Sequence, residues 1–343
     1  MNALLDRLLD HVTMYRLVLY YLVTLIAVAL ALSIAGVLPF APQMLVVSTL
    51  VAVAACALTN RAFARVFEVP ANAESAIITA LILVLILDPV GITDVRGLLG
   101  IAFASVWAMA AKFVLAVGRR HLFNPAALGV FLSGALLDQP ATWWISGHLA
   151  FLPVVIAGGL VVVRKLRRFD LVAVYVLANL LAVVATTAPA DVASAISETV
   201  LSSPLFFFAF VMLTEPLTAP GKRWPRLIFG ALVGALSAPN VHVGTFYLTP
   251  ELALLVGNVL AFALAPQGRF ALTLERIEHA AGDAYDFIFR PDRRVAFEAG
   301  QYLEWTLALD RSDSRGNRRY FTIASAPTEK RVRLGVKFYP GAS

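Results

Sequence analysis

The sequence has a single cysteine and few charged residues, and both shortages restrict what the protein can be. Cys56 is the only thiol among 343 residues, which excludes an intrachain disulfide and an iron–sulfur cluster held by cysteines of this chain alone. Charged residues make up 15% of the chain, whereas a soluble domain carries about 25%. Hydrophobic residues reach 59%, and the mean hydropathy is +0.79. The composition therefore indicates a membrane protein.

Apolar segments follow one another through the first 266 residues. They occupy about residues 15–37, 44–60, 73–88, 98–117, 123–137, 147–163, 170–187, 200–214, 225–238 and 250–266. Several are shorter than the about 20 residues that a straight spanning helix requires. The fifth, eighth and ninth carry or adjoin proline and glycine, so we expect broken or re-entrant helices there. The sequence predicts an α-helical polytopic membrane protein with about ten transmembrane helices.

Basic residues fall in alternate loops. A basic cluster follows every even-numbered segment: Arg61/Arg65, Arg119/Arg120, Arg164 to Arg168, Lys222 to Arg226, and Arg269. The other loops hold almost no lysine or arginine. Because positive loops stay inside, we expect both termini in the cytoplasm of a bacterial inner (plasma) membrane. The positive loops of this topology account for the net charge of +6. We therefore expect the protein to contact membrane lipid and not to bind nucleic acid.

Two of the apolar segments end alike, which favours an internal repeat. The third ends at Asp88-Pro89 and the eighth at Glu215-Pro216, so each apolar run closes with an acid and a proline. Since the two segments lie five helices apart, the copies would have opposite orientations. This pattern predicts a 5+5 inverted repeat with a site near the midplane. Coincidence is the alternative, because one short similarity carries the prediction.

Three stretches, residues 74–80, 121–129 and 210–220, carry a family likeness. The second contains Phe-Asn-Pro-Ala and the third contains the acid-proline pair. Together they resemble the membrane subunits B of the sodium-pumping NADH:quinone reductase and D of the Rnf electron-transfer complex, over about residues 40–266. The resemblance implies a ten-helix fold with inverted repeats that holds flavin and passes electrons. We therefore expect residues 1–266 to form a membrane electron-transfer domain.

One departure from that family concerns the flavin. The resemblance implies FMN attached to the threonine of a Ser-Gly-Ala-Thr type segment before the eighth helix, but residues 190–199 contain no such segment. A non-covalent FMN or riboflavin is therefore the form that the membrane domain would hold. Asn124 offers an amide to an isoalloxazine edge, or else Asn124 and Pro125 merely begin a helix. Glu215 is either an ion or proton site or a carboxylate at the water interface.

The long apolar segments end before residue 267, and residues 267–343 have a different hydropathy pattern. Apolar and polar residues alternate through residues 271–277, 284–290 and 302–307, with Gly, Pro and Asp between these runs. Period-two alternation predicts antiparallel strands and turns. We expect this tail to form a partial antiparallel β-barrel.

Residues 319–325 of the tail read Arg-Tyr-Phe-Thr-Ile-Ala-Ser, and a Gly-Gln element precedes them at residues 300–301. This arrangement resembles the Arg-x-Tyr-Ser/Thr-x-x-Ser signature of the ferredoxin:NADP reductase superfamily, with phenylalanine where tyrosine is usual. The resemblance implies that the tail is the N-terminal part of an FAD-binding reductase barrel, truncated at Ser343. The implied FAD-binding residues are Arg319, Tyr320, Phe321, Thr322, Ser325 and Lys337.

These residue types suit the parts of FAD. The Arg319 guanidinium suits a pyrophosphate, and the Phe321 ring can stack on a flavin. Thr322 is placed to hydrogen-bond the flavin N5 region, and Ser325 would complete the pocket. Alternatively, Arg319 is a surface cation and Phe321 is ordinary barrel core.

The predicted function is that of a membrane-bound flavoprotein oxidoreductase. NAD(P)H would reduce FAD in the tail, and electrons would pass to a flavin or other acceptor in the membrane domain, then to a quinone or a redox protein. We expect the fragment to be inactive alone. No catalytic residue and no metal ligand is predicted.

Two other functions are alternatives to this one. A stacked-haem core, as in ferric reductases and NADPH oxidases, cannot be built from the five histidines, which are His11, His121, His148, His242 and His279. The remaining alternative is an ion transporter with a regulatory flavin-binding tail, in which Asp88 or Glu215 would serve ion movement.

Overall fold

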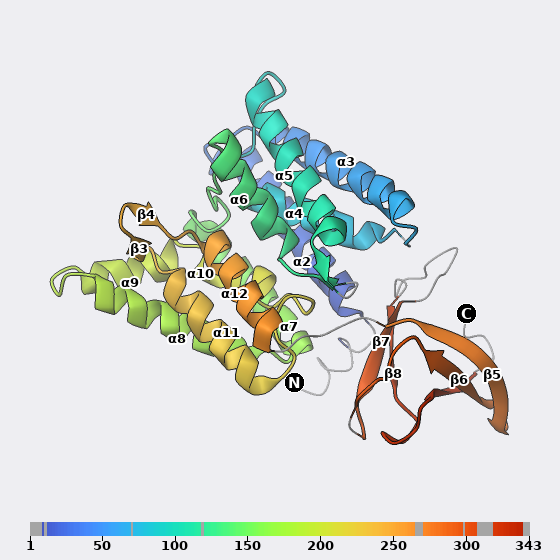
Figure 1. The fold of residues 1–343 in the computed structure, drawn as a ribbon. Coiled ribbons are helices and arrows are strands. Elements are labelled where there is room, and N and C mark those ends of the chain that lie inside the picture. Colours follow the sequence, from blue (N-terminus) through green and yellow to red (C-terminus); the bar gives the residue numbers. More distant parts are fainter. Residues whose placement is uncertain are drawn as a thin grey trace. The chain divides into compact units, whose positions relative to one another are not determined.

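The computed structural model describes residues 9, 12–69, 71–117, 120–264, 270–297, 299–306 and 318–338. The chain divides into two compact units, Met1–Gln267 and Gly268–Ser343. Figure 1 shows the first unit as helices and the second as strands. Arg119, Arg269 and His11, which the sequence analysis placed in loops or before the first helix, lie outside the described residues.

The first unit is built from helices joined by short loops. In chain order they are α2 (Met14–Ile34), α3 (Pro42–Val66), α4 (Ala73–Ile86), α5 (Val95–Val114), α6 (Pro125–Leu137), η1 (Leu149–Phe151), α7 (Leu152–Leu166), α8 (Phe169–Thr186), α9 (Val192–Leu201), α10 (Leu205–Phe207), η2 (Phe208–Met212), α11 (Arg223–Leu236) and α12 (Pro250–Leu264). Each predicted apolar segment coincides with one of these helices, and η2 is a π-helix that continues α10.

Side-chain caps and prolines set several helix starts. The side chains of Thr13, Asn72, Asp94 and Asn124 each accept a backbone N–H in the first turn of the helix that follows. Proline begins α6 directly after Asn124, where its missing N–H costs nothing. The ends of the helices are therefore encoded locally.

Helix length limits how many helices can cross a membrane alone. Among the described residues, five helical stretches are long and apolar enough, namely α2, α3, α5, η1 with α7, and α8. The pair α9 and α10–η2 is bent by 56° and would be a sixth, broken span. This bend confirms the predicted break in the eighth segment. The helices α4, α6 and α12 are shorter apolar helices, so the described residues form a multi-pass helical membrane protein with five or six candidate spans.

Two halves of the first unit repeat one packing scheme. Helix α3 packs on α4 and α5, and α8 packs on η2 and α11. Helix α5 packs on α6 as α11 packs on α12, and α2 packs on α4 as α7 packs on α10 and η2. The halves meet where α2 contacts α7 and where α6 contacts α12 (Figure 1).

A small antiparallel hairpin also recurs in each half. Strands β1 (Ala116–Val117) and β2 (Arg120–His121) lie between α5 and α6. Strands β3 (His242–Val243) and β4 (Phe246–Tyr247) lie between α11 and α12. In each half the hairpin leads into a helix that begins with proline, Pro125 or Pro250.

The second unit contains antiparallel strands, as predicted. Strands β5 (Leu272–Ala281), β6 (Ala284–Pro291) and β9 (Val332–Lys337) form one sheet in the order β5-β6-β9. Strands β7 (Tyr302–Thr306) and β8 (Arg318–Thr322) form a second, separate sheet. The prediction of a partial barrel is corrected here, because the five described strands stay in two sheets that do not close.

Candidate functional site

A cavity of about 70 Å³ lies between the two halves of the first unit. Apolar side chains of α2, α4 and η2 form most of its wall, and Val18, Ile82 and Val211 are among them. Polar and charged groups enter it at two places, from Lys112 on α5 and from Glu215 after η2. A mostly apolar wall with a few convergent polar groups is typical of a ligand site.

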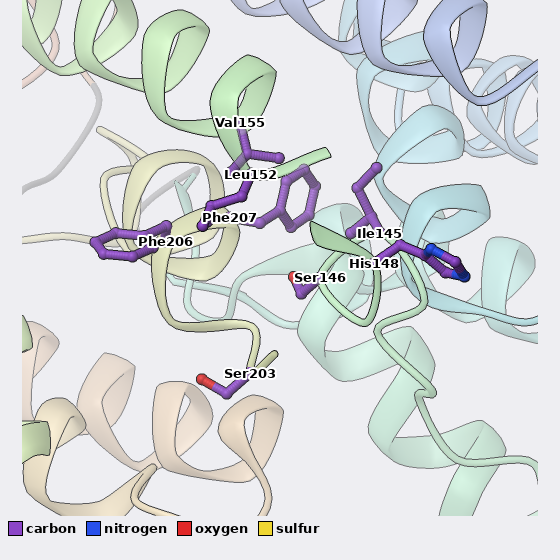
Figure 2. Close-up of a pocket in the computed structure, with 8 residues that line it drawn as sticks. All are labelled: Ile145, Ser146, His148, Leu152, Val155, Ser203, Phe206 and Phe207. Atoms are coloured by element: carbon purple, nitrogen blue, oxygen red, sulfur yellow. The ribbon is translucent and has the colours of Figure 1, made fainter. Parts of the chain in front are cut away.

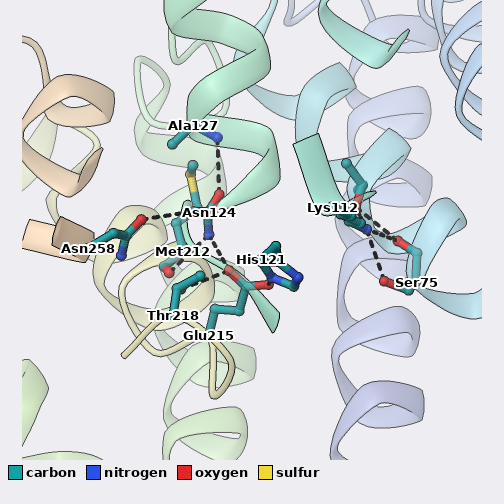
Figure 3. Close-up of polar contacts among 10 residues, drawn as sticks. Ser75, Lys112, His121, Asn124, Ala127, Met212, Glu215, Thr218 and Asn258 are labelled. Atoms are coloured by element: carbon teal, nitrogen blue, oxygen red, sulfur yellow. Dashed lines mark hydrogen bonds and ion pairs between the residues drawn. The ribbon is translucent and has the colours of Figure 1, made fainter. Parts of the chain in front are cut away.

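Asn124 joins three segments at the edge of this cavity (Figure 3). Its Oδ1 accepts the Ala127 N–H at 3.0 Å, which caps α6. Its Nδ2 donates to the Met212 carbonyl at 3.3 Å and to Glu215 Oε2 at 2.9 Å. Its backbone N–H donates to Asn258 Oδ1 on α12 at 2.8 Å. The cap interpretation of Asn124 is therefore confirmed, and both amide hydrogens are already engaged within the protein.

Glu215 is the centre of a polar cluster outside the helices. Oε1 lies 3.3 Å from His121 Nε2, and Oε2 also accepts the Thr218 hydroxyl at 2.9 Å. Burial opposes ionisation of the carboxyl, but His121, Lys112 and Thr218 outweigh it and hold the pKa of Glu215 below its usual range. Glu215 is therefore a carboxylate enclosed by donors from β2, α6 and its own loop.

Lys112 brings the cationic group to the cavity (Figure 3). Its Nζ donates to Ser75 Oγ at 2.9 Å, to Thr79 Oγ1 at 2.8 Å and to the Ser75 carbonyl at 3.3 Å. These oxygens come from one face of α4, so the ammonium is held between α4 and α5. A fixed cation near a mostly apolar wall attracts an anionic or electron-rich group.

The cavity fits a flavin by its chemistry rather than by its volume. Sites for drug-sized ligands measure about 300–1,000 Å³, so a cavity of about 70 Å³ admits the edge of a ring system and requires its walls to part for the rest. The three N–H donors of Lys112 are engaged with α4, so Lys112 offers its positive charge to the carbonyl edge of an isoalloxazine. Asn124 has only its Oδ1 left to offer as an acceptor.

A second, smaller cavity of about 10 Å³ lies where α7 begins (Figure 2). Ser146, His148 and Ser203 supply its polar atoms, and Phe206 and Phe207 are among its apolar lining. Such a volume corresponds to about one water molecule. It is too small to contribute to a cofactor site.

The segment that would carry covalent FMN forms α9. Thr199 is buried near the end of this helix, and its carbonyl accepts the Ser203 hydroxyl. No Ser-Gly-Ala-Thr segment occurs in residues 190–199. Covalent attachment of the kind that the resemblance implies has no matching residue here.

The predicted FAD residues of the tail are divided between two faces of β8. Phe321 packs edge-on against Trp305 at 6.4 Å between ring centroids, and Trp305 in turn contacts Phe289 at 4.9 Å. Tyr320 is exposed and donates to Glu304 Oε2 at 2.9 Å, and Thr322 is exposed beside it. Arg319 pairs with Trp305 across the β7–β8 ladder. Phe321 thus has one ring contact within the tail, and its stacking on flavin stays a prediction.

Ser325 and Lys337 lie beyond β8. Ser325 is buried, and its Oγ accepts the Arg333 N–H at 3.2 Å, which ties the segment after β8 to β9. Lys337 is the last residue of β9 and is exposed opposite Ala284. The described residues therefore bring Ser325 to the edge of β9 but give no single pocket that contains all six predicted residues.

Sequence reasoning missed Lys112 and Asn258. Lys112 is the one lysine or arginine in the apolar segment at residues 98–117, and a lone cation inside such a segment is itself a signal of function. Asn258 could have been noticed in the same way, as an amide inside the last apolar segment. The pairing of either residue with a segment far along the chain is visible only in the fold.

Together, the fold and the cavity define a multi-pass helical membrane protein whose two similarly packed halves enclose a site with one half-buried cation, Lys112, and one half-buried carboxylate, Glu215. Residues 142–265 match the model of the NQR2, RnfD, RnfE family, so this part of the chain, from just before α7 to the end of α12, is similar to that family. The match covers about a third of the chain and includes residues 210–220, whereas residues 74–80 and 121–129 lie outside it. No curated protein matches the chain.

Proposed function

We propose that the protein is a membrane-bound flavoprotein oxidoreductase, in which residues 1–266 pass electrons within the membrane. The match of residues 142–265 to the NQR2, RnfD, RnfE family carries this proposal. Subunits of that family serve redox-driven, ion-pumping complexes that transfer electrons through flavins. Electron transfer through a membrane flavin requires a cavity with charged groups among apolar helices, and the cavity at Lys112 and Glu215 has this character.

The proposed membrane flavin is a non-covalent FMN or riboflavin. Lys112 and the Asn124 Oδ1 would hold the ring edge at the cavity, and the positive charge of Lys112 would favour the reduced, more electron-rich flavin. When bound, the flavin supplies the conversion between two-electron and one-electron transfer. The apolar wall from α2, α4 and η2 would exclude water from the ring.

The repeated packing scheme supports a 5+5 inverted repeat in the first unit. The correspondence of α3–α5 with α8–α11, and of α6 with α12, is what a pseudo-two-fold relation produces. On this proposal the short helices α4, α6, α11 and α12 also lie at membrane depth, enclosed by protein. The unit would then have about ten membrane segments and both ends on the cytoplasmic side.

The proposed donor side is the tail, with FAD bound at β8 and NAD(P)H as the reductant. The spacing of Arg319, Phe321, Thr322 and Ser325 supports this part of the proposal, together with the antiparallel strand β8 that carries the first three. Arg319 would hold the pyrophosphate, and Tyr320 and Lys337 would border the cofactor. A quinone or a redox protein is the proposed acceptor.

Flavin analysis of the purified protein tests this function. The protein is expressed from its complete gene, denatured with acid, and its released flavins are identified by chromatography. We expect FAD together with FMN or riboflavin in the supernatant and no flavin in the pellet. A protein without released flavin would contradict the proposal, and flavin bound to the pellet would contradict its non-covalent form.

The transporter alternative is favoured by one observation, the enclosed carboxylate of Glu215 beside His121 and Lys112. Buried charges at membrane depth also mark ion pathways. The same flavin analysis distinguishes the two functions, because a transporter with a regulatory tail would release FAD alone. A second flavin species requires a site in the membrane unit.

A further inference from the structure

A second buried acid lies at the start of α12, far along that helix from the Glu215 cluster. Glu251 is in the first turn of α12 and is only 4% exposed. Its Oε2 is buried and has no hydrogen-bond partner among the described residues. A buried carboxylate oxygen without a partner is costly, so its environment demands an explanation.

The groups around the Glu251 carboxyl are few and uncharged. They are the Thr249 hydroxyl, the Trp143 side chain and the backbone N–H of Glu251 itself. No lysine, arginine or histidine in the described part of the chain pairs with it. Burial without a cation favours the neutral carboxylic acid over the carboxylate, because nothing nearby replaces the lost hydration of a charge.

The backbone holds Trp143 at Glu251 in an unusual conformation. Trp143 has φ +53°, a region that bulky residues rarely adopt. Its N–H donates to the Ile86 carbonyl at the end of α4 at 3.1 Å, and its ring lies edge-on to Phe208 of η2 at 5.9 Å. The end of α4, the π-helix and the start of α12 therefore meet at this tryptophan. Backbone strain at a positive φ persists only where surrounding contacts hold it, and it is common at functional sites.

The ligand that suits these groups is a proton rather than a metal ion. The described residues hold no group of three His, Cys, Asp or Glu side chains that could bind a metal. An indole N–H is a donor only, so Trp143 would face a cation with its positive end. The Thr249 and Trp143 donors favour the carboxylate, so it is burial without a nearby cation that favours a proton on Glu251.

Helix α12 links this carboxyl to the Glu215 cluster. Glu251 and Asn258 are seven residues apart, so they lie on the same face of α12, with a rise of about 10.5 Å between them. Asn258 accepts the N–H of Asn124, which donates to Glu215. The Nδ2 of Asn258 is also buried without a partner among the described residues. The two unpartnered polar groups, Glu251 Oε2 and Asn258 Nδ2, thus belong to residues on one buried face of α12.

We propose that Glu251 is a proton-binding site of the membrane unit, held neutral at pH 7 and set at the opposite end of the α12 face from the Glu215 cluster. The bond that forms and breaks is the O–H bond of the Glu251 carboxyl, and water on the side of the β3–β4 hairpin gives and takes the proton. This inference does not depend on the presence of a flavin.

Infrared spectroscopy of the full chain in lipid vesicles tests the proposal. A protonated carboxylic acid has a carbonyl stretching band that ionised Asp and Glu lack. At pH 7 we expect this band in the wild-type protein, its loss in Glu251→Gln and its retention in Glu215→Gln, the matched control. Trp143→Phe should keep the band and shift its frequency, because the indole hydrogen bond is lost.

Three results would overturn the proposal. They are a wild-type protein without the band at pH 7, a band that persists in Glu251→Gln, and a band lost in Glu215→Gln alone. The first needs no variant, so it remains decisive if Glu251→Gln does not fold. The Trp143→Phe spectrum supplies a second variant with the carboxyl intact.

Discussion

Short polar side chains hold this membrane unit together at points that an apolar pattern does not reveal. Asn124 shows the principle, because one amide caps α6, closes the end of η2 and supports Glu215. Its position before proline predicted the helix start, since cap chemistry is local. The partners Met212, Glu215 and Asn258 lie more than 80 residues away, and no local rule could supply them.

The threefold role of Asn124 can be measured against a residue that has only a capping role. Asn124→Ala should lower the free energy of unfolding by about 2–4 kcal/mol, since it loses a cap and a hydrogen bond to a charged group. Asn72 caps α4 through the Ser75 N–H at 3.0 Å, so Asn72→Ala should cost about 1 kcal/mol. Thermal unfolding in detergent compares the two variants. Equal losses would contradict the linking role of Asn124.

Acid should act on the membrane unit through Glu215. Its pKa is lowered by folding, so its contribution to stability is complete above the unfolded value of about 4.3 and is lost as pH falls through the lower folded value. Between pH 6 and pH 3, Glu215→Gln should therefore lose less stability than the wild type. The midpoints of thermal unfolding at each pH measure this loss. The exposed Glu198 supplies the control, and Glu198→Gln should follow the wild type. A Glu215→Gln profile parallel to the wild type would refute this.

At the level of helices, sequence reasoning located the apolar segments, and five or six stretches of the described residues have the length and composition of a span. The apolar runs predicted where helices lie, because a buried or lipid-facing helix needs such a run. The apolar runs did not predict how long each helix is. Asp88-Pro89 ends one run and Asn124-Pro125 begins another, and proline limits the helix at each place. The π-helix η2 was not predicted either, because tertiary packing around Phe208 to Met212 decides that geometry.

Two close helix crossings depend on glycines. A Cβ on Gly129 of α6 would lie 2.3 Å from the Ala104 carbonyl, and one on Gly234 of α11 would lie 2.4 Å from the Tyr175 carbonyl. Gly129→Ala and Gly234→Ala should each cost about 1–3 kcal/mol, because the helices must move apart. In Gly91→Ala the nearest atom would be 3.9 Å away, so this control should be neutral. Unchanged thermal unfolding midpoints in Gly129→Ala and Gly234→Ala would contradict this close helix packing.

For the whole molecule, the two units differ in how far the sequence predicts them. Alternation in residues 271–307 predicted antiparallel strands, since period two is intrinsic to a strand. The partial barrel was wrongly predicted, because a barrel depends on strand pairing across β6 and β7, which the alternation does not encode. The six residues proposed to bind FAD were named from a resemblance in sequence, but the division of Arg319 to Thr322 between the two faces of β8 required the fold.

The proposed topology predicts which exposed positions react from outside the cell. In a Cys56→Ser background, Ile92→Cys should be labelled by a membrane-impermeant maleimide in whole cells, since Ile92 is 74% exposed in a loop with little positive charge. Lys330→Cys in the exposed tail should be labelled only after the cells are opened. Labelling of Lys330→Cys in intact cells would place the tail where reduced nicotinamide is absent, which contradicts the proposed donor side.

The central claim is that electrons pass from the tail to the membrane unit, and anaerobic rapid mixing with NAD(P)H measures this directly. In the protein from the complete gene, the flavin absorbance of FAD should bleach first and that of the membrane flavin should follow. Arg319→Ala should abolish both steps. The control is Arg331, whose side chain donates to Glu275, and Arg331→Ala should leave both steps unchanged. Bleaching of FAD alone in the wild-type protein, with the membrane flavin still oxidised, would contradict the account.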